Sequence, residues 1–348
     1  MSGPMRGARA RVACLSLLVL LVLLAVAHGA PAQDDYYRGK TIRIVVGYSA
    51  GGGFDTYARA IARHLAKHVA GKPSVIVENM PGAAGLVAAN SIYRAGRPDG
   101  LTIVNFQSNQ VMGQILGREG VEFDARKFEW IGAPTRENAV CALTRASGIT
   151  SGQQWAASKT PVKLGSVAPG GATHDVPRVL QAALGLPIHL VRGYKGTAEI
   201  RLAAQSGEVA GACWPWESLR PTWRQALDAG EAAVVLQVTE KPLPDLPGVP
   251  MALDLARTDE ARQLIRTGII VPTTVSRLYA MPPATPADRV RIIRAAFLKT
   301  LSDPEFVSDA RQAQLDIDPV SGEDVTRLVG ELFKMPPAVL AKLKELLR

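Results

Sequence analysis

Hydrophobic and polar residues follow two alternating patterns along most of the chain. Short apolar runs typical of buried strands alternate with segments whose apolar residues recur at helical spacing. The helical pattern is clearest at residues 56–69 and 177–184, and it returns at 286–301 and at 322–347, where two prolines interrupt it. The predicted strands span residues 41–46, 74–78, 102–106, 140–145, 163–167, 189–193, 209–212 and 233–238. This order predicts an α/β protein with mainly parallel sheets flanked by helices.

The first 32 residues have a different pattern. Three arginines with no acid precede a mostly apolar stretch at residues 15–27, and Ala30-Pro31-Ala32 follows it. This order is typical of a cleavable secretory signal peptide. A membrane anchor is the alternative, but the stretch is short, because a bilayer core needs roughly 20 apolar residues. We therefore predict export, with residues 1–32 removed, and a mature protein in the periplasm.

Length and charge narrow the picture further. Removing 32 of the 348 residues leaves 316, which is more than one compact core usually organises, so we expect two lobes. The formal charge is +9, or +6 without the three signal arginines. Such a charge attracts anions. It does not predict nucleic-acid binding, because no run of lysines and arginines is interleaved with aromatic residues.

Two glycine-rich loops carry the clearest chemical signal. Each follows a predicted strand and opens a helical segment, one at Gly47–Asp55 and the other at Asn79–Gly85. A loop of this kind directs unpaired backbone N–H groups and the positive end of a helix dipole at one point. The chain is therefore predicted to hold an anion.

The order of these motifs resembles the Bug/TctC family of periplasmic solute receptors of tripartite tricarboxylate transporters. The resemblance rests on residues 42–46, 50–55, 78–85, 98–100 and 193–197, in this order, and on 246–250. It implies a two-lobed periplasmic binding protein fold (type II-like) with a ligand cleft between the lobes. By this resemblance lobe 1 comprises residues 33–135 plus 240–348, and lobe 2 comprises 136–239. It also implies a monomer that closes on a small organic carboxylate and docks on membrane subunits. We expect no cofactor or metal, because the sequence has no P-loop and no His, Cys or carboxylate cluster with metal-ligand spacing.

The resemblance also implies a set of ligand-binding residues. The first loop contributes Tyr48, Ser49, Ala50, Gly51, Gly52, Phe54 and Asp55, and the facing loop contributes Ser166, Gly170, Gly171, Ala172, Thr173 and His174. Gln107, Ser108, Tyr194 and Lys195 follow other strands and are candidates for the distal part of the ligand. The facing loop departs from the common family form at residues 167–169, so the identity of the ligand is not inherited.

Several of these residues have a structural role as the alternative. Asp55 is expected to cap a helix and fix the loop, because a bare carboxylate would repel an anion. His174 is either a capping residue or a ligand contact, and Lys195 either neutralises a second carboxylate or lies in solvent. Trp214 and Trp216 either line a pocket or belong to the core.

The cysteines leave two alternatives open. The mature chain keeps only Cys141 and Cys213, and an oxidising compartment permits them to pair. They form either a disulfide between neighbouring strands or two buried thiols.

One motif favours a different class of protein. Residues 47–51 fit G-x-S-x-G, the nucleophile elbow of α/β-hydrolases, with Ser49 as the nucleophile. Such an enzyme needs an acid and then a histidine downstream, but the last histidine here is His189. The elbow would also lie on the first mature strand, with no preceding sheet. A secreted hydrolase is therefore disfavoured, and the remaining alternative is a receptor that signals to a membrane sensor.

Overall fold

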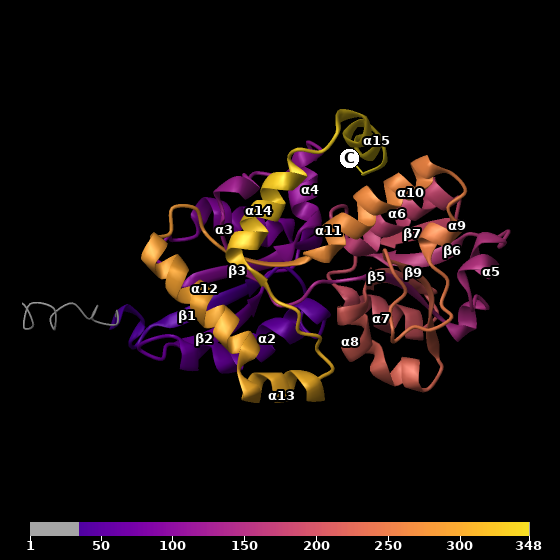
Figure 1. Ribbon diagram of the computed structural model, residues 1–348. Helices are drawn as coiled ribbons and strands as arrows, with labels where there is room; N and C mark the ends of the chain where they lie inside the picture. The colour runs from indigo at the N-terminus through magenta and orange to yellow at the C-terminus, as the bar shows by residue number, and fades with distance from the viewer. Residues whose placement is uncertain (1–34, 348) are drawn as a thin grey trace, which may run out of the picture.

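The computed structural model describes residues 35–347, so the predicted signal peptide lies outside the described residues. The chain forms two lobes, each built on a mixed sheet with helices on its faces (Figure 1). The left lobe in Figure 1 holds the indigo start of the chain together with orange and yellow helices, and the right lobe is mostly magenta and orange. The predicted two-lobed α/β fold is confirmed. Within residues 35–347, no helix has the length and apolar character needed to cross a membrane.

Lobe 1 contains a six-stranded sheet in the order β11-β4-β10-β3-β1-β2. Its strands are β1 (Thr41–Val46), β2 (Ser74–Asn79), β3 (Thr102–Gln107), β4 (Glu129–Ala133), β10 (Arg277–Met281) and β11 (Val320–Ser321). The helices of this lobe include α2 (Gly53–Leu65), α3 (Leu86–Ala95), α4 (Asn109–Ile115), α12 (Ala287–Ser302), α13 (Pro304–Gln312) and α14 (Gly322–Leu332). All residues of β3 and β10 are buried, because these strands lie in the middle of the sheet between helical layers.

Lobe 2 contains a five-stranded sheet in the order β7-β6-β8-β5-β9. Its strands are β5 (Ala139–Thr144), β6 (Val162–Ser166), β7 (Ile188–Arg192), β8 (Gly211–Pro215) and β9 (Ala232–Val238). Its helices include α5 (Gly152–Ala156), α6 (Ala172–Leu184), α7 (Thr197–Gln205) and α8 (Trp216–Asp228). Three of these helices, α6, α7 and α8, begin just after a strand of the sheet or a short loop that follows it.

The sheets are mixed, so the prediction that they are mainly parallel is wrong in this detail. In lobe 1, β1 pairs in parallel with β2 and β3, but β10 is antiparallel to both β3 and β4. In lobe 2, β6 is parallel to β7 and β8, but β5 is antiparallel to β8 and β9. The reason is that β5 and β10 each begin just after the chain has crossed between the lobes. We call these two crossings, residues 134–138 and 271–276, the hinge. The two strands therefore run away from the cleft, whereas strands followed by a crossover helix run toward it.

The packing of the helices after β9 bears on where the chain crosses back between the lobes. Helices α9 (Ala252–Leu255) and α10 (Asp259–Ile265), with the π-helical turn at Arg266–Ile270, pack on lobe 2. The chain then passes through α11 (Val271–Thr274) into β10. The proline-dense passage before α9 therefore stays with lobe 2. We propose that lobe 2 comprises residues 136–274, instead of 136–239.

A third connection is made by α15 (Pro337–Leu347), which packs against α6 of lobe 2. Figure 1 shows it as the yellow helix set apart from the other yellow helix, α14. The Nη2 atoms of two arginines donate to its last turn, Arg118 to the Leu347 carbonyl at 3.0 Å and Arg178 to the Leu346 carbonyl at 3.4 Å. Arg118 comes from lobe 1 and Arg178 from lobe 2, so the helix is held from both sides.

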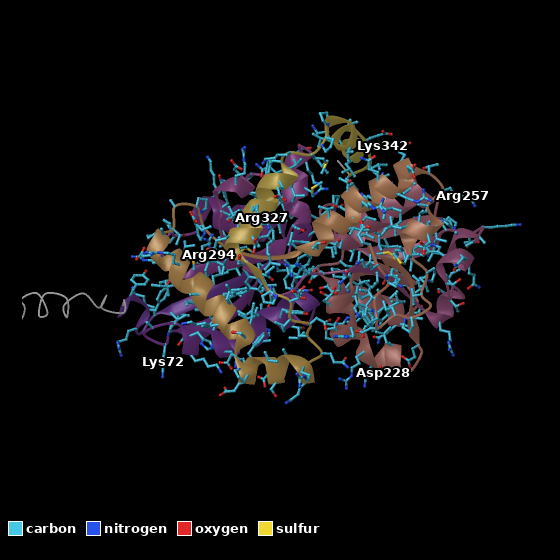
Figure 2. All side chains as sticks on the ribbon, in the orientation of Figure 1. Lys72, Asp228, Arg257, Arg294, Arg327 and Lys342 are labelled. Atoms are coloured by element: carbon cyan, nitrogen blue, oxygen red, sulfur yellow. A yellow bond between two sulfur atoms is a disulfide. The ribbon has the colours of Figure 1, made fainter. Side chains whose placement is uncertain are left out.

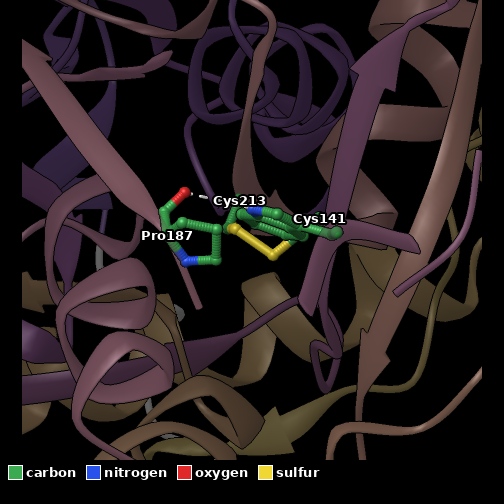
Figure 3. Close-up of a disulfide and its surroundings, with 4 residues drawn as sticks. Cys141, Pro187 and Cys213 are labelled. Atoms are coloured by element: carbon green, nitrogen blue, oxygen red, sulfur yellow. Dashed lines mark hydrogen bonds between the residues drawn. A yellow bond between two sulfur atoms is a disulfide. The ribbon is translucent and has the colours of Figure 1, made fainter. Parts of the chain in front are cut away.

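The two cysteines form a disulfide in the centre of lobe 2. Cys141 and Cys213 are register partners in the antiparallel pair β5–β8, and both are fully buried. Figure 3 shows the bond beside Pro187, whose carbonyl accepts from the indole N–H of Trp155. The bond closes a loop with a sequence separation of 72 residues, which includes α5, α6 and α7.

Replacing both cysteines by alanine is expected to destabilise the protein by about 2–4 kcal/mol, because the cross-link restricts the unfolded chain. Calorimetry with and without a phosphine reductant measures this. The Tm of the parent should fall to that of the double variant when the disulfide is reduced, while the variant should not respond. A parent whose Tm is unchanged by complete reduction would contradict a stabilising disulfide.

Candidate functional site

The N-terminal ends of four helices converge on one cavity between the lobes. Gly53 begins α2, Ala172 begins α6, Thr197 begins α7, and Pro215 immediately precedes α8. All four residues lie in the wall of the cavity. The first-turn N–H groups of a helix have no acceptor within the helix, and the helix dipole makes that end positive. The cavity is therefore surrounded by partial positive charge from the backbone of both lobes.

The full wall contains thirteen residues. They are Tyr48, Gly52, Gly53, Phe54, Gln107, Val167, Gly171, Ala172, Thr173, Thr197, Trp214, Pro215 and Ser218. None of them is a lysine, arginine or histidine, and none is an acid. Charged side chains lie elsewhere, and Figure 2 labels Lys72, Asp228, Arg257 and Lys342 near the periphery of the molecule.

Asp55 fixes the first glycine-rich loop without entering the cavity. Its side chain is buried and accepts hydrogen bonds from Gly51 N at 2.9 Å and Asn79 Nδ2 at 3.0 Å, and it pairs with Arg59 at 2.9 Å. Burial alone would raise the pKa of Asp55, but the bonds from Arg59, Gly51 and Asn79 hold it below the ordinary value. A charged Asp55 thus restrains the loop that opens α2.

Tyr48 and Gln107 connect this loop to the facing lobe. The Tyr48 hydroxyl lies 2.8 Å from Gln107 Oε1 and 3.0 Å from the Ala84 carbonyl oxygen. Gln107 Oε1 also accepts from Ala172 N in lobe 2 at 3.1 Å. The ring of Tyr48 packs on Phe54, with centroids 4.5 Å apart. One side of the cavity is therefore closed by a polar contact that requires both lobes.

The facing loop is organised by Asp175. This buried carboxylate accepts from Gly170 N at 3.0 Å and lies 3.0 Å from His174 Nδ1. From lobe 1, Asn109 Nδ2 and Arg118 Nη2 approach it at 3.3 and 3.4 Å. Burial would raise the pKa of Asp175, but His174 and Arg118 hold it below the ordinary value. This ionised carboxylate fastens the two lobes beside the cavity.

Seven of the residues predicted from the sequence lie in the cavity wall: Tyr48, Gly52, Phe54, Gln107, Gly171, Ala172 and Thr173. The wall does not include the other ten, which are Ser49, Ala50, Gly51, Asp55, Ser108, Ser166, Gly170, His174, Tyr194 and Lys195. Six wall residues were not among the predicted set: Gly53, Val167, Thr197, Trp214, Pro215 and Ser218. Gly53 and Thr197 open helices, Val167 directly follows β6, and Pro215 ends β8 just before α8. A strand followed by a helix is a signal that the sequence does contain.

The residues outside the wall have other contacts. Ser108 Oγ donates to the Pro272 carbonyl at 2.6 Å and so belongs to the hinge. The Tyr194 hydroxyl donates to Glu208 at 2.6 Å, on the surface. The Lys195 side chain is exposed, although its carbonyl accepts from Ser49 N across the lobes at 3.4 Å. His174 supports Asp175, which agrees with the structural alternative for this histidine.

Ser49 has no neighbour that could activate it. Its Oγ is buried without a hydrogen-bond partner among the described residues. It lies against Gly196 of lobe 2, where an added Cβ would be 2.4 Å from it. A nucleophilic serine needs a base within hydrogen-bond reach. The geometry therefore gives no support to the nucleophile-elbow interpretation.

A cluster of acids and a histidine lies far from the cleft, on α2 and α13. His64, Asp303 and Glu305 place three possible ligand atoms within 4.8 Å of one another. Lys67 Nζ already donates to both carboxylates, at 2.8 and 2.9 Å, and His64 is bonded to Asp309. These contacts account for the cluster as a network of ion pairs.

A buried charge cluster lies behind the cavity, where the crossings meet. Arg277, at the start of β10, forms an ion pair with Glu137 of the first crossing, and both side chains are fully buried. Its Nη2 also donates to Ser218 of α8. The guanidinium stacks on Phe54 and Tyr57 of α2, 4.4 and 4.2 Å from the ring centroids. One side chain thus contacts both lobes and the hinge.

Glu217 is next to this cluster and has an unusual proton affinity. Burial, and then the charge of Glu137, raise the pKa of Glu217 to about 8, despite hydrogen bonds from Asn138. Glu217 is therefore protonated near neutral pH. Below its ordinary value of 4.5 the folded and unfolded states are both protonated. Above it the unfolded chain loses the proton that the folded protein keeps, so stability falls as pH rises toward 8.

Glu217→Gln should remove this pH dependence, because glutamine resembles the protonated acid. The free energy of unfolding of the variant relative to that of the parent is expected to increase from pH 5 to pH 8, by up to about 1.4 kcal/mol per pH unit, and then to level off. Thermal denaturation at several pH values measures the difference. Glu119→Gln, in an exposed loop, is the control and should show no such trend. A constant difference between E217Q and the parent would refute the raised pKa.

This geometry defines a class of protein: two α/β lobes whose helix N-termini face a shared cavity between them. The family described as the tripartite tricarboxylate transporter family receptor (TctC) matches residues 57–344. The chain belongs to this family of solute receptors. The resemblance inferred from the glycine-rich loops is therefore confirmed.

Relatives in several bacteria extend over nearly the whole chain. A UPF0065 protein from the gbd 5' region of Cupriavidus necator is 26% identical over 339 residues, covering 91% of each chain. A UPF0065 protein from the ttuE-ttuC' intergenic region of Agrobacterium vitis is 27% identical over 355 residues, covering 94% of this chain and 89% of the relative.

Solved structures show the same fold. The periplasmic binding protein BugD aligns with a TM-score of 0.71 at 21% identity, covering 89% of this chain and 98% of BugD. MatC from Rhodopseudomonas palustris, solved with bound malate, aligns with a TM-score of 0.69 at 20% identity, covering 89% of this chain and 99% of MatC. A further R. palustris protein, solved with adipate, aligns with a TM-score of 0.69 at 20% identity, covering 88% of this chain and 98% of its own.

Proposed function

We propose that the protein is an extracytoplasmic receptor that captures a small organic carboxylate between its lobes for uptake by a tripartite tricarboxylate-type transporter. The observation that carries this is the convergence of α2, α6, α7 and α8 on a single cavity. Backbone N–H groups at helix N-termini bind carboxylates well, since each bond is charge-assisted. The malate and adipate of the two R. palustris structures are carboxylates of this general kind.

The closed cleft explains how the ligand would be presented to a partner. Polar contacts between the lobes, such as Arg201 Nη2 with the Gly51 carbonyl at 2.9 Å, form at the rim of the closed cleft. Closure removes water from the anion and strengthens its bonds to the backbone. It also creates one continuous surface from two lobes, which membrane subunits can distinguish from the open form. The receptor acts as a non-enzymatic monomer in the periplasm, after removal of the signal peptide.

A thermal-shift screen of the mature protein tests the proposal, after unfolding and refolding to remove any bound solute. The panel contains mono-, di- and tricarboxylates and their uncharged amides. At least one acid should raise the Tm in a concentration-dependent way, because a ligand that binds only the folded state stabilises it by mass action. Its amide should not. If no acid in the panel shifts the Tm, the proposed function is wrong.

Gly53→Ala should prevent closure without damaging the fold. Gly53 opens α2, and an added Cβ would lie 2.3 Å from Ser218 Cβ across the cleft. Affinity for the acid found in the screen should fall about tenfold or more, a loss of at least about 1.4 kcal/mol in binding free energy. Calorimetric titration measures this.

Gly330→Ala is the matched control for this substitution. It is also a helical glycine, in α14, and no atom lies within 4 Å of an added Cβ. Its affinity should equal that of the parent. Equal affinities of the two variants would show that the contact between Gly53 and Ser218 does not govern binding.

A further inference from the structure

The cavity can hold a charge only through helix N-termini and neutral side chains. The positive ends of four helix dipoles face it, while Phe54, Val167, Trp214 and Pro215 supply apolar surface. In the described part of the chain, no charged side chain lies in the wall. A second carboxylate on the ligand would have to share these helix ends with the first and would repel it across a small cavity, with no cationic side chain in the wall to pair with it. An unpaired buried charge is costly, so the wall selects against it.

Arg277 is the cation behind this wall, and its charge is already compensated. Glu137 pairs with it, and its Nη2 also donates to Ser218. Phe54 separates the guanidinium from the cavity, since Phe54 lines the cavity and stacks on Arg277. Glu137 therefore neutralises Arg277, whose Nε and Nη1 donate to no other described atom, and Arg277 is not part of the wall.

The closed cavity is also small. About 30 Å³ of it is open to the centre of a water molecule, and a single water needs roughly 10–15 Å³ by this measure. Unless side chains of the wall move, the closed cavity therefore accommodates only a few heavy atoms of a ligand. A long or branched acid would hold the lobes apart and lose the contacts at Gln107 and Asp175.

Trp214 adds one polar requirement. It lies in the wall with a side chain that is 1% exposed, and its Nε1 donates to no other described atom. An indole N–H that is buried without a partner costs about 1–3 kcal/mol. An acceptor on the ligand would satisfy it, and a neutral oxygen would avoid the charge that the wall disfavours.

We propose that the ligand is a short monocarboxylate with an uncharged, mostly apolar body and one neutral acceptor for Trp214 Nε1. This proposal rests on the proposed function and makes it specific. The carboxylate binds at the helix N-termini, and the body lies against Phe54, Val167 and Pro215. Trp214 distinguishes an oxo or hydroxy acid from a simple fatty acid.

Matched acids test the selection against a second charge. Calorimetric titration of the refolded parent compares butanoate with succinate, propanoate with malonate, and 2-oxobutanoate and acetoacetate with butanoate. The monocarboxylates should bind at least about tenfold more tightly than the dicarboxylates of equal length, a difference of about 1.4 kcal/mol. One of the two oxo acids should bind more tightly than butanoate.

Trp214→Phe tests the polar requirement, since it removes the N–H and keeps an aromatic ring. The preference for the oxo acid over butanoate should disappear, with butanoate affinity nearly unchanged. Trp223→Phe is the control. Trp223 stacks on Trp214 at 5.5 Å, and its Nε1 is also unpaired, but it lies outside the wall. It should keep the preference of the parent.

The outcomes separate this inference from the proposed function. If succinate or malonate binds more tightly than its monocarboxylate partner, the inference is wrong, while the protein remains a carboxylate receptor. If neither oxo acid is preferred over butanoate, or W214F keeps the preference, Trp214 has no part in recognition and the acceptor is removed from the proposal. If no acid binds, both proposals are wrong. The comparison of acids with the parent needs no variant and stays decisive if W214F fails to fold.

Discussion

The buried ion pair between Arg277 and Glu137 is the interaction on which the arrangement of the lobes depends. It joins the two chain crossings, which also share a backbone bond from Glu137 N to the Thr274 carbonyl at 3.2 Å. Burying two charges costs several kcal/mol of desolvation, so such a pair contributes more to geometry than to stability. Through Phe54 and Ser218, Arg277 determines how α2 faces α8. We infer that the hinge sets the shape of the cavity wall.

A cleft without a cationic side chain has a consequence for release. An anion held by fixed dipoles is bound strongly only while water is excluded, because the interaction weakens as the dielectric constant rises. Opening of the lobes by a membrane partner would therefore weaken binding at once. A lysine or arginine in the wall would keep a pair with the anion after opening. The use of helix ends thus suits a protein that must both capture and deliver.

The sequence was most informative where structure is local. The strands at 41–46 and 74–78 and the glycine-rich loops were predicted because apolar runs and turn residues lie within one short window. Strands β4 and β10 were missed because charged residues stand at their starts. Strand β4 begins with Glu129, and β10 begins with Arg277, a charge that is buried only through its distant partner Glu137. The wall residues Thr197, Pro215 and Ser218 were missed because their position depends on contacts distant in the sequence, and Trp214 was left between two alternatives. Whether Trp214 belongs to the core or to a cavity depends on how α8 meets α2, and nothing near Trp214 in the sequence shows that.

The placement of the tryptophans makes the protein its own optical reporter. Of the five, Trp214 lies in the cavity wall, while Trp130 and Trp155 are buried in lobe 1 and lobe 2 away from it. Indole emission depends on the polarity around the ring and on hydrogen bonding at its N–H. Closure on a solute changes the polarity around Trp214 and the hydrogen bonding at its N–H, and it leaves the surroundings of Trp130 and Trp155 intact. Capture and release can therefore be followed in real time by intrinsic fluorescence, with no label attached.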